Sequence, residues 1–213
     1  RKPAENKDRY TIVYSHSNGM DLGPWFRYLR RLGKRCESNV FAYEYSGYGL
    51  SGGRPSERNL YADIESVVKT LVCDKHMNCK RIILLGESIG SVPSIHLASS
   101  ISMAGVILKA PLMSGIRTMF DYSGNTWTFD PFPNIELISK VDCPILIIHG
   151  TEDEVIDISH GISLYKRCRH PVSPLWVSGR NHSTLRLDEQ FFPRIQLFIT
   201  EIENFHKNQS IKV

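Results

Sequence analysis

Six short runs of apolar and β-branched residues recur along the chain, and most of the gaps between them are long enough to hold a helix. The runs occupy residues 11–14, 40–43, 82–85, 105–108, 145–148 and 175–177. Strands that alternate with helices form βαβ units, in which the strands pair in parallel. Several of the runs are apolar without polar alternation, as strands covered on both faces are. The pattern therefore predicts an α/β fold with a mostly parallel sheet and helices on both faces.

The gaps between the runs indicate five helices and one insertion. We predict helices at about residues 22–36, 57–73, 89–101, 158–168 and 189–206. In the last of them, apolar residues recur at helical spacing from Phe192 to Phe205. In residues 113–143 the apolar residues follow neither a helical nor a strand period, and the stretch contains Pro131 and Pro133. It is far longer than an ordinary connection between a helix and a strand. We interpret this stretch as a short insertion before the strand at 145–148.

The composition is that of one ordinary globular domain over residues 1–213. Of the 213 residues, 41% are hydrophobic and 23% are charged, and the net charge of +4 argues against a dedicated nucleic-acid binder. No apolar run reaches the length of a membrane span, and the polar opening is not a signal peptide. The five cysteines are odd in number and contain no C-x-x-C pair, which favours reduced thiols and an intracellular location. Because no initiator methionine is present, missing N-terminal strands or a missing targeting segment stays an open alternative.

The run at 82–85 leads into a G-E-S-I-G motif at 86–90, which frames Ser88 with two glycines at the end of a predicted strand. In open parallel sheets, chemistry gathers beyond the carboxyl ends of the strands. A sharp strand-to-helix turn exposes a nucleophilic hydroxyl and needs small residues two positions before and after it. The same turn presents the next backbone N–H, that of Ile89, to a developing oxyanion. We predict that Ser88 is a nucleophile; the alternative is a serine in a turn that only links strand and helix.

A nucleophilic serine needs a base and a group that orients the base, and on this scaffold they follow in the order serine, acid, histidine. Asp153 lies just past the predicted strand at 145–148, and His182 lies just past the one at 175–177. We predict Asp153 as the acid and His182 as the base. Neighbouring residues stay open as alternatives, namely Glu152, Glu154 and Asp157 for the acid and His149 and His160 for the base.

Further stretches resemble the α/β-hydrolase domain-containing protein 17 family, and the resemblance runs from Tyr10 to about Phe198. The stretches are YSGYG at 45–49, PSE at 55–57, NLYADI at 59–64, PLMSG at 111–115 and HGTEDEVID at 149–157. Members of that family are serine hydrolases that remove palmitate from cysteine thioesters on membrane-bound proteins. The resemblance implies an α/β-hydrolase fold and a triad of Ser88, Asp153 and His182. This chemistry requires no cofactor and no metal.

The sequence departs from the family pattern at three points. After the first predicted strand the family has His-Gly-Asn, whereas this chain has His16-Ser17-Asn18. We place the second oxyanion donor at the backbone N–H of Asn18. The cysteine-rich N-terminus by which the family attaches to membranes is not in this sequence, and neither are the one or two leading strands usual in the fold. We therefore expect either a truncation or a smaller sheet.

The predicted insertion contains large apolar residues. Two interpretations stay open: they line a site for the acyl group, or they only pack the insertion against the rest of the domain. They are Met113, Met119, Phe120, Tyr122, Trp127, Phe129 and Phe132. The candidate substrate contacts among them are Met113, Met119, Phe120 and Trp127. The predicted function is a palmitoyl-protein thioesterase acting on acylated proteins, in the cytoplasm or peripherally on the cytosolic face of a membrane. The alternatives are a small-molecule or lysolipid carboxylesterase and, in another class, an inactive hydrolase fold that serves as a binding module.

Two other motifs suggest different classes of site. Residues 47–52 match the G-x-G-x-x-G pattern of dinucleotide-binding turns, but residues 53–56 separate them from the next predicted helix, whereas a Rossmann turn opens directly into its helix. Four residues of metal-ligand type, whose spacing matches no strong metal motif, are His149, Asp153, Asp157 and His160. The sequence disfavours both a dinucleotide site and a metal site.

The predicted helix at 22–36 carries a basic face. Arg27, Arg30, Arg31 and Lys34 follow one another at helical spacing. Such a face is either a solvated helix surface or a site of attraction to anionic lipid.

Overall fold

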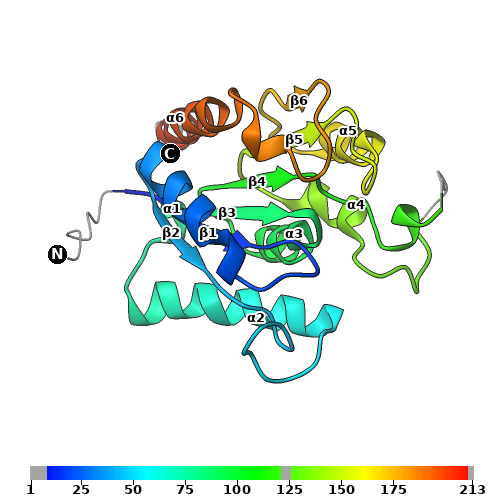
Figure 1. The fold of residues 1–213 in the computed structure, drawn as a ribbon. Coiled ribbons are helices and arrows are strands. Elements are labelled where there is room, and N and C mark those ends of the chain that lie inside the picture. Colours follow the sequence, from blue (N-terminus) through cyan, green and yellow to red (C-terminus); the bar gives the residue numbers. More distant parts are fainter. Residues whose placement is uncertain (1–8, 121–125, 211–213) are drawn as a thin grey trace.

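The computed structural model describes residues 9–120 and 126–210, and a six-stranded sheet forms its centre (Figure 1). The strands are β1 (Thr11–Ser15), β2 (Asn39–Ala42), β3 (Ile82–Glu87), β4 (Gly105–Lys109), β5 (Ile145–Gly150) and β6 (Leu175–Val177). They lie in the order β2-β1-β3-β4-β5-β6, and each pair of neighbours is parallel. The predicted parallel sheet is confirmed, because every strand overlaps its predicted run.

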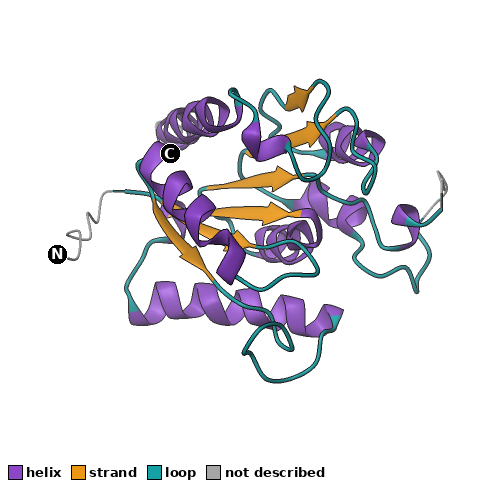
Figure 2. Ribbon diagram, viewed as in Figure 1, coloured by secondary structure: helices purple, strands orange, loops and turns teal. Residues whose placement is uncertain are grey.

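Helices cover both faces of this sheet (Figure 2). One face carries α1 (Phe26–Arg35) and α6 (Phe191–Ser210), and the other carries α2 (Glu57–Lys69), α3 (Ser91–Ser100) and α5 (Ile158–Arg167). Successive side chains of a strand point to opposite faces. In β3, Ile83 and Leu85 accordingly pack in the cluster that contains α1 and α6, while Ile82 and Leu84 pack in the cluster that contains α2, α3 and α5. The prediction of helices on both faces is confirmed.

The predicted helices differ from the observed ones mainly at their ends. A 3₁₀ turn at Gly23–Trp25 precedes α1, a π-helical turn at Thr70–Asp74 follows α2, and a 3₁₀ turn at Ser88–Gly90 precedes α3. The last helix, α6, continues beyond the predicted end at residue 206. Among the described residues, no helix combines the length and apolar character needed to cross a bilayer.

The predicted insertion between β4 and β5 contains short helical segments in its described part. They are the 3₁₀ turns Ile116–Thr118 and Ile138–Lys140 and the helix α4 (Asn134–Leu137). Arg117 and Asp130 form a buried ion pair at 3.3 Å, and Asp130 also accepts a hydrogen bond from the backbone N–H of Ile116 at 2.9 Å. Its later part is held by apolar packing, because Ile135, Ile138 and Val141 belong to the hydrophobic core. Tyr122, one of the large apolar residues noted in the predicted insertion, lies outside the described residues.

Parallel pairing places the carboxyl ends of all six strands at one edge of the sheet. Ser88 directly follows β3, Asp153 follows β5, and His182 follows β6. The three residues of the predicted triad therefore lie on loops of the same edge.

Candidate active site

Ser88 lies in a strained turn between β3 and α3. Its φ is +55°, in the left-handed region that residues with a Cβ atom rarely adopt. The flanking glycines let backbone segments pass closely, because a Cβ atom on Gly86 would lie 2.3 Å from the Gly90 carbonyl oxygen. A Cβ atom on Gly90 would lie 2.0 Å from the carbonyl oxygen of Ser15 in β1. The two glycines are therefore required where α3 begins against β1 and β3.

We expect Gly90→Ala to lower the free energy of unfolding by at least about 2 kcal/mol, because the added methyl group overlaps backbone atoms that no rotamer change can move aside. Thermal unfolding followed by circular dichroism measures the loss. Gly52→Ala is the matched control, since a Cβ atom there meets nothing within 4 Å, and its effect should stay within about 0.5 kcal/mol. Equal stability of the two variants would contradict the close approach of α3 to β1.

Asp153 and His182 form a hydrogen-bonded pair at the carboxyl ends of β5 and β6. The His182 Nδ1 atom lies 2.8 Å from Asp153 Oδ2 and 3.0 Å from Oδ1. The Asp153 side chain is fully buried, whereas 13% of the His182 side chain is exposed. The imidazole thus has one nitrogen held by a buried carboxylate and stands at the surface of the site, which suits a proton-accepting base.

Hydrogen bonds keep the Asp153 carboxylate ionised. Burial by itself raises the pKa of this carboxyl group, but hydrogen bonds from His149, His182 and the backbone N–H of Ile156 outweigh burial and hold the pKa well below its usual range. The backbone N–H of Val155 donates to the same carboxylate at 3.0 Å. Asp153 can therefore orient His182 and stabilise its imidazolium form as an anion.

His149 is a second histidine that contacts the predicted acid, and sequence reasoning did not assign it that role. Its Nε2 atom lies 2.8 Å from the carbonyl oxygen of Ile156 and 3.3 Å from Asp153 Oδ2. A carbonyl oxygen only accepts, so Nε2 carries the hydrogen atom. His149 is fully buried, and it contacts the same Asp153 oxygen, Oδ2, as the partly exposed His182.

The remaining alternatives for acid and base occupy other surroundings. Glu152 and Glu154 are exposed. Asp157 caps α5 by accepting a hydrogen bond from the backbone N–H of Ser159 at 2.8 Å. His160 is buried and accepts a hydrogen bond at Nδ1 from the backbone N–H of Met113 at 3.0 Å. Of the alternatives, only His149 contacts the Asp153–His182 pair.

The predicted oxyanion donors belong to the turn of Ser88 and to the loop after β1. Ile89 follows Ser88 in the turn, and the exposed Asn18 follows β1, where its Oδ1 atom accepts a hydrogen bond from Tyr48 OH at 2.6 Å. Neighbouring His16 is buried, and its ring stacks on Tyr45 with centroids 4.1 Å apart. In the described part of the chain no hydrogen bond joins the Ser88 hydroxyl to His182, and such bonds often tighten only with substrate. The serine–histidine contact and both oxyanion donors stay predictions.

The candidate substrate contacts from the insertion do not line the cavity that adjoins the site. Ile89 and Phe132 line that cavity, together with residues that follow β2. Met119 and Phe120 are 76% and 63% exposed, and Trp127 is 44% exposed. Met113 packs against the hydrophobic core.

A buried ion pair beneath the serine is a feature that the sequence patterns did not predict. Lys109 Nζ lies 2.5 Å from Glu87 Oε1, and Tyr14 OH donates to Glu87 Oε2 at 3.0 Å. The two charged residues are register partners at the ends of β3 and β4. Burial lowers the pKa of Lys109, while the Glu87 carboxylate opposes that effect. A charged residue at the end of each of two neighbouring apolar strands is the sequence signal that could have revealed the pair.

The structure also describes the glycine-rich stretch and the residues of metal-ligand type, the two motifs that the sequence analysis disfavoured. Residues 53–56 separate the glycine-rich stretch at 47–52 from α2, whose N-cap is Ser56. Within the described residues, no three histidine, cysteine or acidic side chains form a group that could hold a metal ion.

Solved structures with the same fold include esterases and lipases. A monoacylglycerol lipase from Paleococcus ferrophilus superposes with a TM-score of 0.70 at 15% identity, covering 90% of this chain and 94% of that one. An esterase from Rhodococcus has a TM-score of 0.71 at 19% identity, with 92% of each chain covered. These likenesses confirm the predicted α/β-hydrolase fold.

Sequence comparison identifies closer relatives, although no family model matches the chain. Alpha/beta hydrolase domain-containing protein 17C of Xenopus tropicalis is 50% identical over 192 residues, which cover 90% of this chain and 62% of that protein. Human alpha/beta hydrolase domain-containing protein 17B is 48% identical over 193 residues, which cover 91% of this chain and 67% of the human protein. The chain thus spans about three fifths to two thirds of the length of these curated relatives. At this identity and coverage, the chain belongs to the α/β-hydrolase domain-containing protein 17 family.

Proposed function

We propose that the chain is a serine hydrolase that cleaves acyl esters and thioesters through an acyl-serine intermediate. The observation that carries this proposal is the hydrogen bond between His182 and the buried Asp153, which lies at the same sheet edge as the strained turn of Ser88. Folding alone does not require a serine at φ +55° at the same sheet edge as an imidazole held by a buried carboxylate. Sequence similarity to relatives named alpha/beta hydrolase domain-containing proteins supports the same conclusion.

In the proposed mechanism, His182 Nε2 takes the proton of Ser88 as its oxygen attacks the acyl carbonyl carbon. The backbone N–H groups of Ile89 and Asn18 stabilise the developing oxyanion. The leaving thiol or alcohol departs with the proton from His182, which leaves the acyl-serine ester. His182 then activates a water molecule that releases the carboxylic acid and restores Ser88. Throughout, Asp153 fixes the imidazole tautomer.

The proposed substrates are palmitoyl thioesters of lipidated proteins, and a small-molecule or lysolipid carboxylesterase is the second candidate. The family resemblance supports the thioester, whereas the structural neighbours named esterase and monoacylglycerol lipase favour the second candidate. We further propose a cytoplasmic location or peripheral attachment to a membrane. The exposed basic residues Arg27, Arg30 and Arg31 of α1 support an attraction to anionic lipid.

The proposal predicts a marked difference between leaving groups. A palmitoyl-cysteine peptide thioester should be cleaved at least about 10²-fold faster than the matched palmitoyl amide, because a thiolate leaves readily while an amine must be protonated by His182 as it departs. Measuring kcat/KM for both peptides and for a short acyl ester, with a detergent control, tests this expectation. Preference for the short ester would favour the carboxylesterase, and equal cleavage of the amide would contradict the proposed substrate class.

A further inference from the structure

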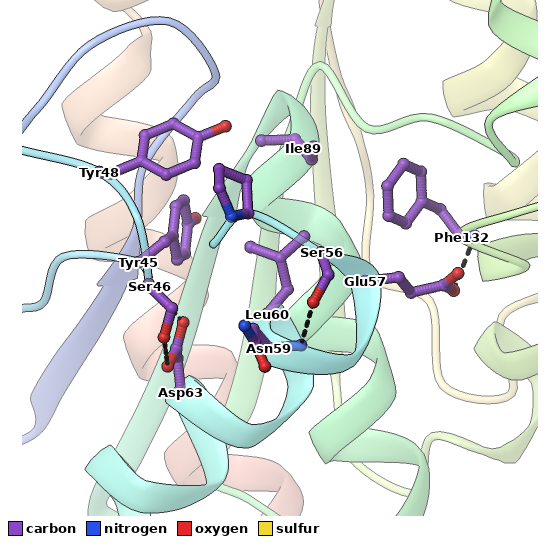
Figure 3. Close-up of a pocket in the computed structure, with 11 residues that line it drawn as sticks. Tyr45, Ser46, Tyr48, Ser56, Glu57, Asn59, Leu60, Asp63, Ile89 and Phe132 are labelled. Carbon is purple, nitrogen blue, oxygen red and sulfur yellow. Dashed lines mark hydrogen bonds between the residues drawn. The ribbon is translucent and has the colours of Figure 1, made fainter. Parts of the chain in front are cut away.

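A cavity of about 180 Å³ lies beside the nucleophile turn. Its walls come from the loop after β2, from the first turns of α2, from Ile89 and from Phe132 in the insertion. Figure 3 shows the side chains of Tyr48, Ile89 and Phe132 along one side of this cavity and those of Ser46, Asn59 and Asp63 on the other. Ile89 is the chain neighbour of Ser88 and carries a predicted oxyanion N–H. The cavity thus adjoins the position at which an acyl carbonyl would react.

The polar side chains of the cavity lining are already paired within the protein. For example, Ser46 Oγ donates to Asp63 Oδ1 at 2.7 Å, and Tyr48 OH donates to Asn18 Oδ1 at 2.6 Å. The two charged residues of the lining, Glu57 and Asp63, are acidic, which disfavours a phosphate or a free carboxylate. The surface left for a ligand is mainly apolar, so the cavity fits an uncharged hydrocarbon chain.

Phe132 forms one wall of the cavity in a strained conformation. Its φ is +61°, which is a rare backbone conformation for a bulky residue and persists only where the surroundings impose it. Glu57 Oε1 accepts a hydrogen bond from the Phe132 N–H at 2.8 Å, and the Phe132 carbonyl accepts one from the Asn134 N–H at 2.7 Å. Glu57 also accepts a hydrogen bond from Tyr61 OH at 2.5 Å. The backbone of Phe132 is therefore held by Glu57 of α2, and its side chain lies across the cavity from the loop after β2 (Figure 3).

We propose that this cavity binds part of the acyl chain of the substrate and that Phe132 determines how long a chain it admits. The inference rests on the proposed function, because it needs an acyl group attached to Ser88. Typical small-molecule pockets enclose about 300–1,000 Å³, so a cavity of about 180 Å³ accommodates only part of a long chain while Phe132 is in place. Phe132 is thus a specificity-determining residue.

The test compares chain-length profiles of the wild type and Phe132→Ala. The kcat/KM values of p-nitrophenyl esters from acetyl to palmitoyl should rise about fourfold with each carbon that enters the apolar cavity and should then level off. In Phe132→Ala the kcat/KM values should level off at chains about two carbons longer, which corresponds to about a sixteenfold gain for those esters relative to the acetyl ester. Phe132→Leu keeps an apolar side chain and should show a smaller shift in the same direction, which guards against misfolding of the alanine variant.

Phe129→Ala is the matched comparison for this test. Phe129 is the same residue type in the same insertion, but it is 72% exposed and lies outside the cavity lining. Its chain-length profile should equal that of the wild type. A shift caused by Phe129→Ala but not by the Phe132 variants would place the acyl chain on the outer surface of the insertion, and an unshifted profile in all variants would also overturn the inference.

Labelling of Ser88 by a small fluorophosphonate separates this inference from the proposed function. Labelled wild-type enzyme with an unshifted Phe132→Ala profile overturns only the acyl cavity. Wild-type enzyme that neither reacts with the probe nor cleaves any ester overturns the proposed function itself.

Discussion

Replacing Ser88 by alanine should lower kcat for ester hydrolysis by about 10⁶-fold, by analogy with subtilisin, where loss of the nucleophile has an effect of that size. Alanine lacks the hydroxyl group that forms the acyl-enzyme. The turn itself should persist, because the Ser88 carbonyl still accepts the hydrogen bond of the Ser91 hydroxyl at 2.6 Å. Stopped assays with an ester substrate measure kcat, and intact-mass analysis after exposure to a fluorophosphonate measures labelling.

Ser183→Ala is the control for Ser88→Ala. Ser183 is an exposed serine that follows His182 in the chain. It is therefore close to the proposed base, but it does not lie in a strained turn as Ser88 does. We expect this variant to be labelled once and to hydrolyse esters as the wild type does. Labelling that persists in Ser88→Ala and disappears in Ser183→Ala would move the nucleophile to Ser183.

The strands are readable from the sequence because a parallel strand covered on both faces needs an uninterrupted apolar run. In β3, for example, every residue from Ile82 to Leu85 is fully buried between two layers of helices. Helix ends are less readable, since the turn at Ser88–Gly90 is fixed by tertiary contacts of Gly90 with β1 rather than by local propensity. Periodicity cannot report such contacts.

The active site can be predicted only in part from the sequence. A sequence indicates which residues follow the ends of strands, but it does not indicate which side chains contact one another. Asp153 and His182 follow strand ends, so the order of the chain brings both to one edge of the sheet. The contact of His149 with Asp153 depends on how the loop after β5 folds back, which no motif encodes. The left-handed backbone of Phe132 is equally hidden, because the residue type gives no sign of positive φ and the conformation is held by the distant Glu57.

Replacing Asp153 by asparagine should lower kcat by about 10⁴-fold, the effect of the same change in a serine protease, where the imidazole then adopts the wrong tautomer. The Asp153 carboxylate faces donors on several sides, including His149, His182 and the backbone N–H of Ile156. An asparagine amide would turn an NH₂ group toward at least one of them. If it donates to His182 Nδ1, then Nε2 keeps its hydrogen atom and cannot accept the proton of Ser88.

The matched control is Asp157→Asn, the same chemical change four positions further along the loop. Asp157 is exposed and caps α5 through Ser159, and asparagine caps helices about as well as aspartate. We therefore expect kcat within about twofold of the wild type for this variant, since its cap is retained. Because an amide facing buried donors also destabilises the fold, melting temperatures are measured beside kcat, and the loss for Asp153→Asn should persist at temperatures where the variant is fully folded. If Asp157→Asn lost activity and Asp153→Asn retained it, the acid that orients His182 would be Asp157, and the short Asp153–His182 contact would have only a structural role.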